Sequence, residues 1–288
     1  MSKRKAIRTD IAWSTTDRIT VKGFDLCKDI LGTLSLGDIA FLELTDRLPT
    51  TRESIVFNAI AVTLVEHGLT PSAIATRMTY TGAPEAMQAA VAAGLCGLGS
   101  VFVGSMETAA RMLQEALPDP SKKADPGQLA KEIVQRFSSR KQAVPGIGHH
   151  LHKPVDPRAP RLFQIAAENG FDGPYVKLMK AVAKEAESVY GKSLPINATG
   201  AIAAIACELK LPWRIVRGIG VMARAIGLVG HILEEMREPM AREIKTRVEE
   251  EARKAVPYRP DRRGAKLSRR PQSAAWCRAK PDSALSTR

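Results

Sequence analysis

The sequence predicts an all-α protein, built almost entirely from closely packed helices. Three observations lead to this fold class. Helix-start signals, in which a capping side chain or a proline precedes an apolar run, recur along residues 50–226. Residues 89–99 are dense in Ala and Gly, which lets helix backbones approach closely in a core. No alternation of strand and helix patterns is present, so a parallel-sheet fold is not expected.

Composition narrows the class of protein. The 288 residues are 44% hydrophobic, enough to bury a core without disulfides or a structural metal. No apolar run approaches the roughly 18 residues of a membrane span, so no transmembrane helix is expected. The basic N-terminus lacks the apolar segment of a secretory signal, which predicts a cytoplasmic protein. The four cysteines, Cys27, Cys96, Cys207 and Cys277, lie far apart and are predicted to be free thiols.

The first elements are a hairpin and three helices. Loose alternation of apolar and polar residues over 6–21 predicts a short β-hairpin. Residues 50–53 have the form of a capping box, and the apolar run 55–65 then predicts a helix that ends near Gly68, with His67 at its end. Thr70-Pro71 and Pro84 predict the starts of the next two helices.

Three later helices have equally clear signals. Asp125-Pro126 begins a helix to about residue 139, Pro174 begins one that Gly191 ends, and Pro212 begins one that runs towards Ile226. About a dozen helices result. We find no fixed-period repeat, which argues against a solenoid.

The net charge of +13 is concentrated at the C-terminus. Residues 252–288 hold 11 Lys/Arg against 2 Asp/Glu, which is +9 of the total and leaves +4 for the rest of the chain. Residues 253–288 are rich in Pro, Ser and Arg without an amphipathic period, so we expect a basic, disordered tail. Either it is a solvated extension or it binds polyanions weakly. Nucleic-acid binding is not expected, because within this basic tail only Tyr258 and Trp276 could stack on bases.

The segment PGIGHHLHKPVDPR, residues 145–158, is the strongest candidate for chemistry. It holds His149, His150 and His152, three of the five histidines of the chain, on a path that Gly and Pro make non-helical. His149, directly after Gly148, is the favoured catalytic residue. A metal site is the alternative, but neighbouring residues rarely bind one ion together and no Cys or carboxylate stands at a familiar ligand spacing, so no metal is expected. His150 and His152 have surface or capping roles as the simpler interpretation.

Two arginines and one lysine are candidate anion-binding groups. Asp156-Pro157 predicts a helix start, which puts Arg158 in the first turn, where a cation is favourable only if an anion lies between it and the helix. Its planar fork suits a carboxylate, whereas Lys153 suits a phosphate. Arg224 stands among apolar residues, so it requires a carboxylate partner from the protein or the substrate. A solvated charge is the simpler alternative for Arg158 and Lys153.

These residues form a pattern that resembles the citrate synthase superfamily. PGIGHHLHKPVDPR is similar to the family's active-site loop, VEHGLTPSA around His67 to its earlier histidine segment, and ARAIGLVGHILEE at 223–235 to its late arginine segment. Together these segments span residues 60–240. Within the superfamily, the segment GLGSVFVGSMETAARML resembles citryl-CoA lyases more than synthases, because Phe102 stands where synthases keep a histidine.

The resemblance implies a citrate synthase-like fold and a homodimer. Residues 1–106 and 211–252 would form a large helical domain, and residues 107–210 a smaller mobile one. His67, Arg158 and Arg224 would bind the substrate carboxylates. Lys153, Gly146 and Gly148 would bind coenzyme A.

The resemblance also implies a reaction. Citryl-CoA, or a similar 3-hydroxy-3-carboxyacyl-CoA, would be cleaved to acetyl-CoA and oxaloacetate by retro-aldol type chemistry, with His149 acting on the C3 oxygen as a group that titrates near neutrality. Asn197 is taken to replace the family aspartate, which moves a proton at the acetyl carbon. An amide cannot do this, but it can donate a hydrogen bond to the enolate. Two alternatives remain: a citrate or 2-methylcitrate synthase, and a non-catalytic CoA-binding paralogue.

Overall fold

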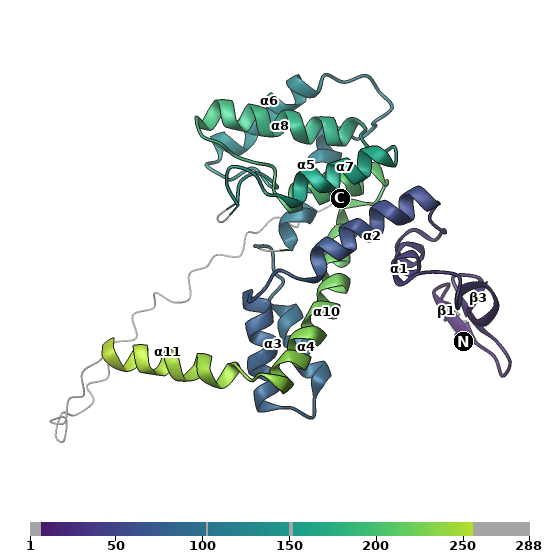
Figure 1. Cartoon of the computed structure of the whole chain (residues 1–288). Coiled ribbons are helices and arrows are strands. Elements are labelled where there is room, and N and C mark those ends of the chain that lie inside the picture. Colours follow the sequence, from purple (N-terminus) through teal and green to yellow (C-terminus); the bar gives the residue numbers. More distant parts are fainter. Residues whose placement is uncertain (1–6, 102, 150–151, 256–288) are drawn as a thin grey trace, which may run out of the picture. The chain divides into compact units, whose positions relative to one another are not determined.

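A computed structural model describes residues 7–101, 103–149 and 152–255 of the chain (Figure 1). The chain forms two units, Met1–Arg242 and Glu243–Arg288. Within the described residues, helices dominate both units, which confirms the predicted all-α class. The division of residues 1–252 into a large and a small domain stays a prediction.

The N-terminal region is a small antiparallel sheet. Strands β1 (Ala12–Ser14), β2 (Ile19–Val21) and β3 (Phe24–Asp25) pair in the order β1-β2-β3. The first two strands confirm the predicted hairpin, and the third was not anticipated. A π-helical turn, η1 (Leu26–Ile30), follows β3, and the side chain of Asp25 caps it.

The remainder of the described chain is helical. The helices are α1 (Leu36–Thr45), α2 (Thr51–Val65), α3 (Pro71–Gly82), α4 (Met87–Cys96), α5 (Gly104–Ala116), α6 (Pro126–Ser139), α7 (Arg158–Glu168), α8 (Pro174–Tyr190), α9 (Ala198–Glu208), α10 (Trp213–Arg237) and α11 (Ala241–Ala255).

Most helix starts follow the predicted signals. Thr50 caps α2 in a reciprocal capping box with Glu53, and Asp125 caps α6 with Pro126 in its first turn. The start predicted at Pro84 is wrong: Pro84 lies in a turn, and α4 begins at Met87 without a side-chain cap. Proline fixes only its own φ angle, which suits a turn as well as a first helical turn.

Helix α9 forms the centre of the core. Its residues from Gly200 to Cys207 are buried, and it packs against α5, α7 and α8. The small side chains of this Ala-rich helix allow close packing on every side. Residues 197–200 at its start face the histidine-rich loop, so the core places one wall of the site.

Helix α10 connects the rest of the first unit. It packs against α2, α3, α4 and α5, and Figure 1 shows it beside α3 and α4. By length and composition alone it could cross a bilayer, although half of its apolar window is buried. Its buried residues include Arg224, His231 and Glu235, which is typical of a core helix that also carries polar contacts.

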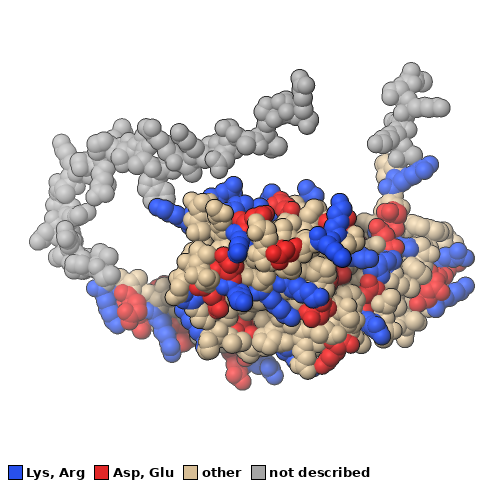
Figure 2. Space-filling model, turned by 90° about the horizontal axis from the view of Figure 1, so that it is seen from above, with Lys and Arg blue, Asp and Glu red and all other residues tan. Residues whose placement is uncertain are grey.

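The end of the described chain corrects one boundary. Residues 253–255, assigned from the sequence to the disordered tail, complete the last turn of α11, and the remaining tail lies outside the described residues. Cys27, Cys96 and Cys207 are free thiols as predicted, while Cys277 lies outside the described part. On the face seen in Figure 2, basic and acidic side chains are interspersed over the described residues.

Candidate active site

A cavity of about 670 Å³ collects the residues singled out in the sequence. It lies where the end of α2, the start of α3, the loop before α5, the 146–149 loop and the starts of α7 and α9 meet α10. Seven of the eight predicted site residues line it: His67, Gly146, Gly148, His149, Arg158, Asn197 and Arg224. Lys153 is exposed and is not among the described lining residues.

His67 lies directly beyond the end of α2. The Glu66 carboxylate accepts hydrogen bonds from the backbone N–H groups of His67 (2.7 Å) and Gly68 (3.0 Å). Gly68 has φ +71°, a left-handed conformation that favours glycine. Burial and the positive charge of Arg158 lower the pKa of His67, so its ring is neutral at pH 7.

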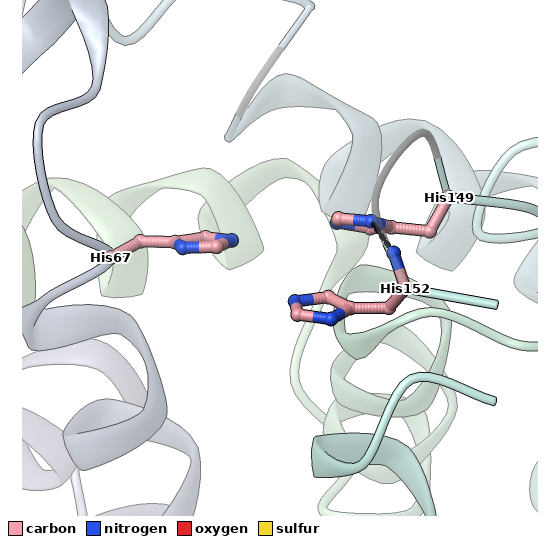
Figure 3. A group of neighbouring side chains, drawn as sticks. All are labelled: His67, His149 and His152. Atoms are coloured by element: carbon pink, nitrogen blue, oxygen red, sulfur yellow. Dashed lines mark hydrogen bonds between the residues drawn. The ribbon is translucent and has the colours of Figure 1, made fainter.

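The ring of His149 is fixed by the chain that follows it. Its Nδ1 accepts a hydrogen bond from the backbone N–H of His152 at 2.9 Å (Figure 3). An accepting nitrogen carries no proton, so the neutral ring carries its proton on Nε2. In this arrangement Nε2 of His149 is a hydrogen-bond donor. Nε2 can accept a proton only if the ring first moves its own proton to Nδ1, which breaks the hydrogen bond from His152.

Three imidazoles face one another in the cavity region. Figure 3 shows His67 pointing from one side towards His149 and His152 on the other. The ring centroid of His67 lies 6.3 Å from that of His149 and 6.1 Å from that of His152. The centroids of His149 and His152 are 4.5 Å apart. His150 and Phe102 lie outside the described residues.

The same three histidines could in principle hold a metal ion, since their ligand atoms lie within 4.8 Å of one another. Two observations make the cavity better suited to an anion. Arg158 and Arg224 both line it, and no carboxylate is among its described lining residues. In addition, His149 would have to move its proton to Nδ1 before Nε2 could bind a metal.

Arg158 is oriented by a buried carboxylate. The Asp156 carboxylate accepts hydrogen bonds from Nε of Arg158 at 3.0 Å and from Nη2 of Arg158 at 2.8 Å. It also accepts hydrogen bonds from the backbone N–H groups of Arg158 and Ala198. Burial alone would raise the pKa of Asp156, but these bonds lower it to about 2. The sequence identified Asp156 only as a helix cap. Arg158 also lines the cavity, so its remaining N–H groups can bind an anion there.

Arg224 is held by neutral groups. Its Nε donates to the carbonyl oxygen of Leu64 at 3.2 Å, and its Nη1 to the hydroxyl of Thr70 at 3.4 Å. Burial lowers the pKa of Arg224, and the charge of Glu66 partly offsets this. With neutral partners in direct contact, this buried cation favours an anionic ligand in the cavity.

Asn197 ties the histidine-rich loop to α9. Its Oδ1 accepts from the backbone N–H of Gly200 and from the Thr199 hydroxyl, and its Nδ2 donates to the carbonyl oxygen of Gly148 at 2.7 Å. The side chain expected to donate to an enolate thus already bonds to the protein. Asn197 fits a positioning role, which the sequence pattern did not reveal because it depends on the tertiary contact.

The backbone conformation at Gly146 and Gly148 favours glycine at both positions. Gly146 has φ +81° and Gly148 φ +80°, both in the left-handed region. A Cβ on Gly146 would lie 2.6 Å from the Cα of Gly200, closer than atoms can pack. The 146–149 loop therefore lies directly on the start of α9, which fixes His149 relative to Asn197.

Comparison with known proteins identifies structures of similar fold. A citryl-CoA lyase structure from Hydrogenobacter thermophilus superposes with a TM-score of 0.73 and 36% identity, over 81% of this chain and 88% of that one. A Methanosaeta concilii ATP citrate lyase variant gives a TM-score of 0.69 and 19% identity, over 90% of this chain and 42% of that one.

Sequence relatives are longer proteins. The probable ATP-citrate synthase subunit 1 of Neurospora crassa is 25% identical over 217 residues, which are 70% of this chain and 31% of the relative. This chain thus spans about a third of the length of such curated relatives. The family described as "Citrate synthase, C-terminal domain" matches residues 25–247, so the chain belongs to the citrate synthase family.

Proposed function

We propose that this protein cleaves citryl-CoA, or a closely similar 3-hydroxy-3-carboxyacyl-CoA, into acetyl-CoA and oxaloacetate. The observation that carries the proposal is the make-up of the cavity: two arginines and the histidines around its described wall, without a carboxylate. Such a wall suits a polycarboxylate substrate. The similarity to a citryl-CoA lyase over 88% of that chain supports the same reaction class.

The cleavage breaks the bond between C2 and C3 of the citryl group. The C3 hydroxyl loses its proton, the C3–O bond becomes the ketone of oxaloacetate, and the electron pair of the broken bond forms the enolate of acetyl-CoA. His149 donates from Nε2 to the C3 oxygen and stabilises its developing charge. A neutral imidazole of the cluster takes the hydroxyl proton, and His67, whose pKa is lowered, is available for this at pH 7.

The enolate carbon must then receive a proton. Because no carboxylate lines the described cavity, we propose that water supplies it. In the reverse direction, condensation would require a base to remove a proton from the methyl group of acetyl-CoA. The missing carboxylate therefore predicts slow proton exchange at the acetyl carbon in both directions, unlike a synthase that has such a base.

Substrate positioning follows from the basic groups. Arg158 and Arg224 bind the carboxylates of the oxaloacetate portion, together with His67. Methanosaeta concilii ATP citrate lyase has been solved with (3S)-citryl-CoA, which supports placing the coenzyme A portion in the corresponding cavity here. Lys153 is exposed and can meet a phosphate, and Gly146 and Gly148 line the cavity in which we place the coenzyme A portion.

We also propose that the protein is a homodimer that pairs through α10. One side of this helix exposes five large apolar side chains at helical spacing: Met222, Ile226, Val229, Leu233 and Met236. A second copy of the helix would cover them. Sedimentation velocity of the purified protein tests this, and a monomer at micromolar concentration would contradict it.

The activity is tested by mixing purified protein with citryl-CoA and following oxaloacetate through malate dehydrogenase and NADH. Thiol release from acetyl-CoA and oxaloacetate, measured in parallel, reports condensation followed by hydrolysis of the citryl-CoA thioester, which is the reaction of a synthase. Cleavage that is faster than condensation supports the proposal. Faster condensation would make the protein a synthase, and tight coenzyme A binding without turnover on several acyl-CoAs would make it a non-catalytic paralogue.

A further inference from the structure

A row of buried polar residues lies on one side of α10, behind the candidate site. Arg224, His231 and Glu235 are all buried, although each carries a charged or titratable group. Their spacing of seven and four residues places them on one helix face. On the facing helix α3, Arg77 is fully buried. Buried charges are costly unless they are well paired, so this set requires an explanation beyond packing.

Arg77 anchors the row. Its Nη1 donates to Glu235 at 2.9 Å, its Nη2 pairs with Glu234, and its Nε donates to Nδ1 of His231 at 3.2 Å. Glu235 in turn accepts from the backbone N–H groups of Met240 and Ala241. A guanidinium on Nδ1 forces that nitrogen to act as an acceptor. The neutral ring of His231 therefore carries its proton on Nε2.

His231 connects this anchor to the site. Its Nε2 lies 3.0 Å from Oε2 of Glu66, although the N–H is not aligned along that line, so the contact is mainly electrostatic. The other oxygen of Glu66 accepts the backbone N–H groups of His67 and Gly68. One carboxylate thus joins the buried row to the backbone that carries a substrate-binding histidine.

Helix α10 also contacts the end of α2 directly. A Cβ on Gly227 would overlap the carbonyl oxygen of Val65 and lie 2.9 Å from Oε2 of Glu66. Only glycine allows this approach. The position of residues 65–67 is therefore set by α10, and not by the intrinsic end of α2 alone.

We propose that Glu66 is a positioning residue that Arg77 holds in place through His231. Glu66 fixes the backbone at His67, and thereby the orientation of the His67 imidazole in the dicarboxylate site. The inference rests on the proposed function for its ligand, oxaloacetate. Glu66 itself is not among the described residues that line the cavity, so it acts through His67.

The test uses Glu66→Ala, Glu66→Gln and the control Glu85→Ala, which removes an exposed carboxylate in the turn before α4. Calorimetry gives the Kd of oxaloacetate, and citryl-CoA cleavage gives KM and kcat. Hydrogen exchange of the segment 64–70 reports the backbone bonds without any ligand. Glu66→Gln keeps an oxygen that can accept both N–H groups, whereas Glu66→Ala does not.

We expect Glu66→Ala to raise the Kd and KM for the dicarboxylate portion about tenfold to a hundredfold, as a displaced binding group does. Exchange at residues 67 and 68 should accelerate in the same variant. Glu66→Gln should recover most of the binding, and Glu85→Ala should match the wild type. A purely structural role would lower Tm and leave Kd unchanged.

Hydrogen exchange, which needs no ligand, separates failure of the proposed function from failure of the positioning role. If wild-type protein neither binds oxaloacetate nor cleaves citryl-CoA, the proposed function fails, while hydrogen exchange still tests the positioning role. Unchanged exchange at residues 67 and 68 in Glu66→Ala overturns that role. A Kd within twofold of wild type in a protein that cleaves citryl-CoA overturns it as well.

Discussion

Asp156 and Arg158 form a two-pronged ion pair two residues apart, with Nε 3.0 Å from Oδ1 and Nη2 2.8 Å from Oδ2. The carboxylate is fully buried, and it also accepts the backbone N–H of Ala198 at the start of α9. The pair thus fixes the orientation of the arginine, to which we assign substrate binding, and joins the loop to the core. Preorganisation of this kind reduces the entropy lost on binding.

Asp156→Asn should weaken both stability and substrate binding. The pKa of about 2 lies below that of a free aspartate, 3.8, so the folded state is stabilised by about 2 kcal/mol once the group is ionised. This contribution is complete above about pH 4 and is lost as the pH falls through about 2. Urea unfolding at pH 6 and pH 2.5 checks it. The difference between wild type and Asp156→Asn should be large at pH 6 and small at pH 2.5; equal differences would contradict the assignment.

His149→Ala should abolish turnover, with a loss of about 10²–10⁴-fold in kcat, because it removes the group on the C3 oxygen. Folding and coenzyme A binding should persist. His152→Ala is the matched control, since its backbone N–H, which holds His149, is kept. We expect the control to stay within tenfold of wild type. If His149→Ala does so too, His149 has no part in the chemistry.

One continuous segment of the sequence contributes much of the described cavity wall. Gly146, Gly148, His149 and Arg158 of this segment, and Arg224, were singled out from local pattern; they line the cavity, and their roles stay predictions. The partners of these residues could not be predicted. Glu66, Asp156 and Asn197 act through contacts with α10, α7 and α9, and no sequence period reports which backbone group a side chain reaches after folding.

The fold shows the same limit. Capping side chains at Thr50, Thr70 and Asp125 were read correctly, because a cap is a local interaction. Pro84 led to a wrong prediction for the start of α4. Helix α10 continues eleven residues past Ile226, to Arg237, because buried contacts with Arg77, and no local sequence signal, stabilise its later turns.

Cleavage should be independent of metal. EDTA treatment followed by gel filtration is expected to leave kcat and KM unchanged, because we propose that the guanidinium and imidazole N–H groups of the cavity bind the anionic substrate. Added Zn²⁺ should inhibit if it reaches the three imidazoles, and excess EDTA should reverse that inhibition. Loss of activity on EDTA treatment, with recovery on adding a divalent ion, would show that His67, His149 and His152 hold a required metal.

Asn197→Asp provides the sharpest test of the loop geometry. If residue 197 faced the acetyl carbon, a carboxylate there would act as a base and speed deuterium uptake into acetyl-CoA with oxaloacetate bound. In the structure, however, Nδ2 donates to the Gly148 carbonyl at 2.7 Å, so the aspartate would place an oxygen against an oxygen. We therefore expect a loss of about 1–3 kcal/mol in stability, slower cleavage and no gain in deuterium uptake.

The matched control is Asn169→Asp, which removes a similar amide bond to the Ile165 carbonyl at the end of α7. It should cost stability without slowing cleavage, because Asn169 is not among the described residues that line the cavity. The comparison separates general destabilisation from displacement of the loop. A stable Asn197→Asp protein with rapid deuterium uptake would mean that the side chain reaches the acetyl carbon. Residue 197 would then take part in the carbon chemistry, as the resemblance to the citrate synthase superfamily implied.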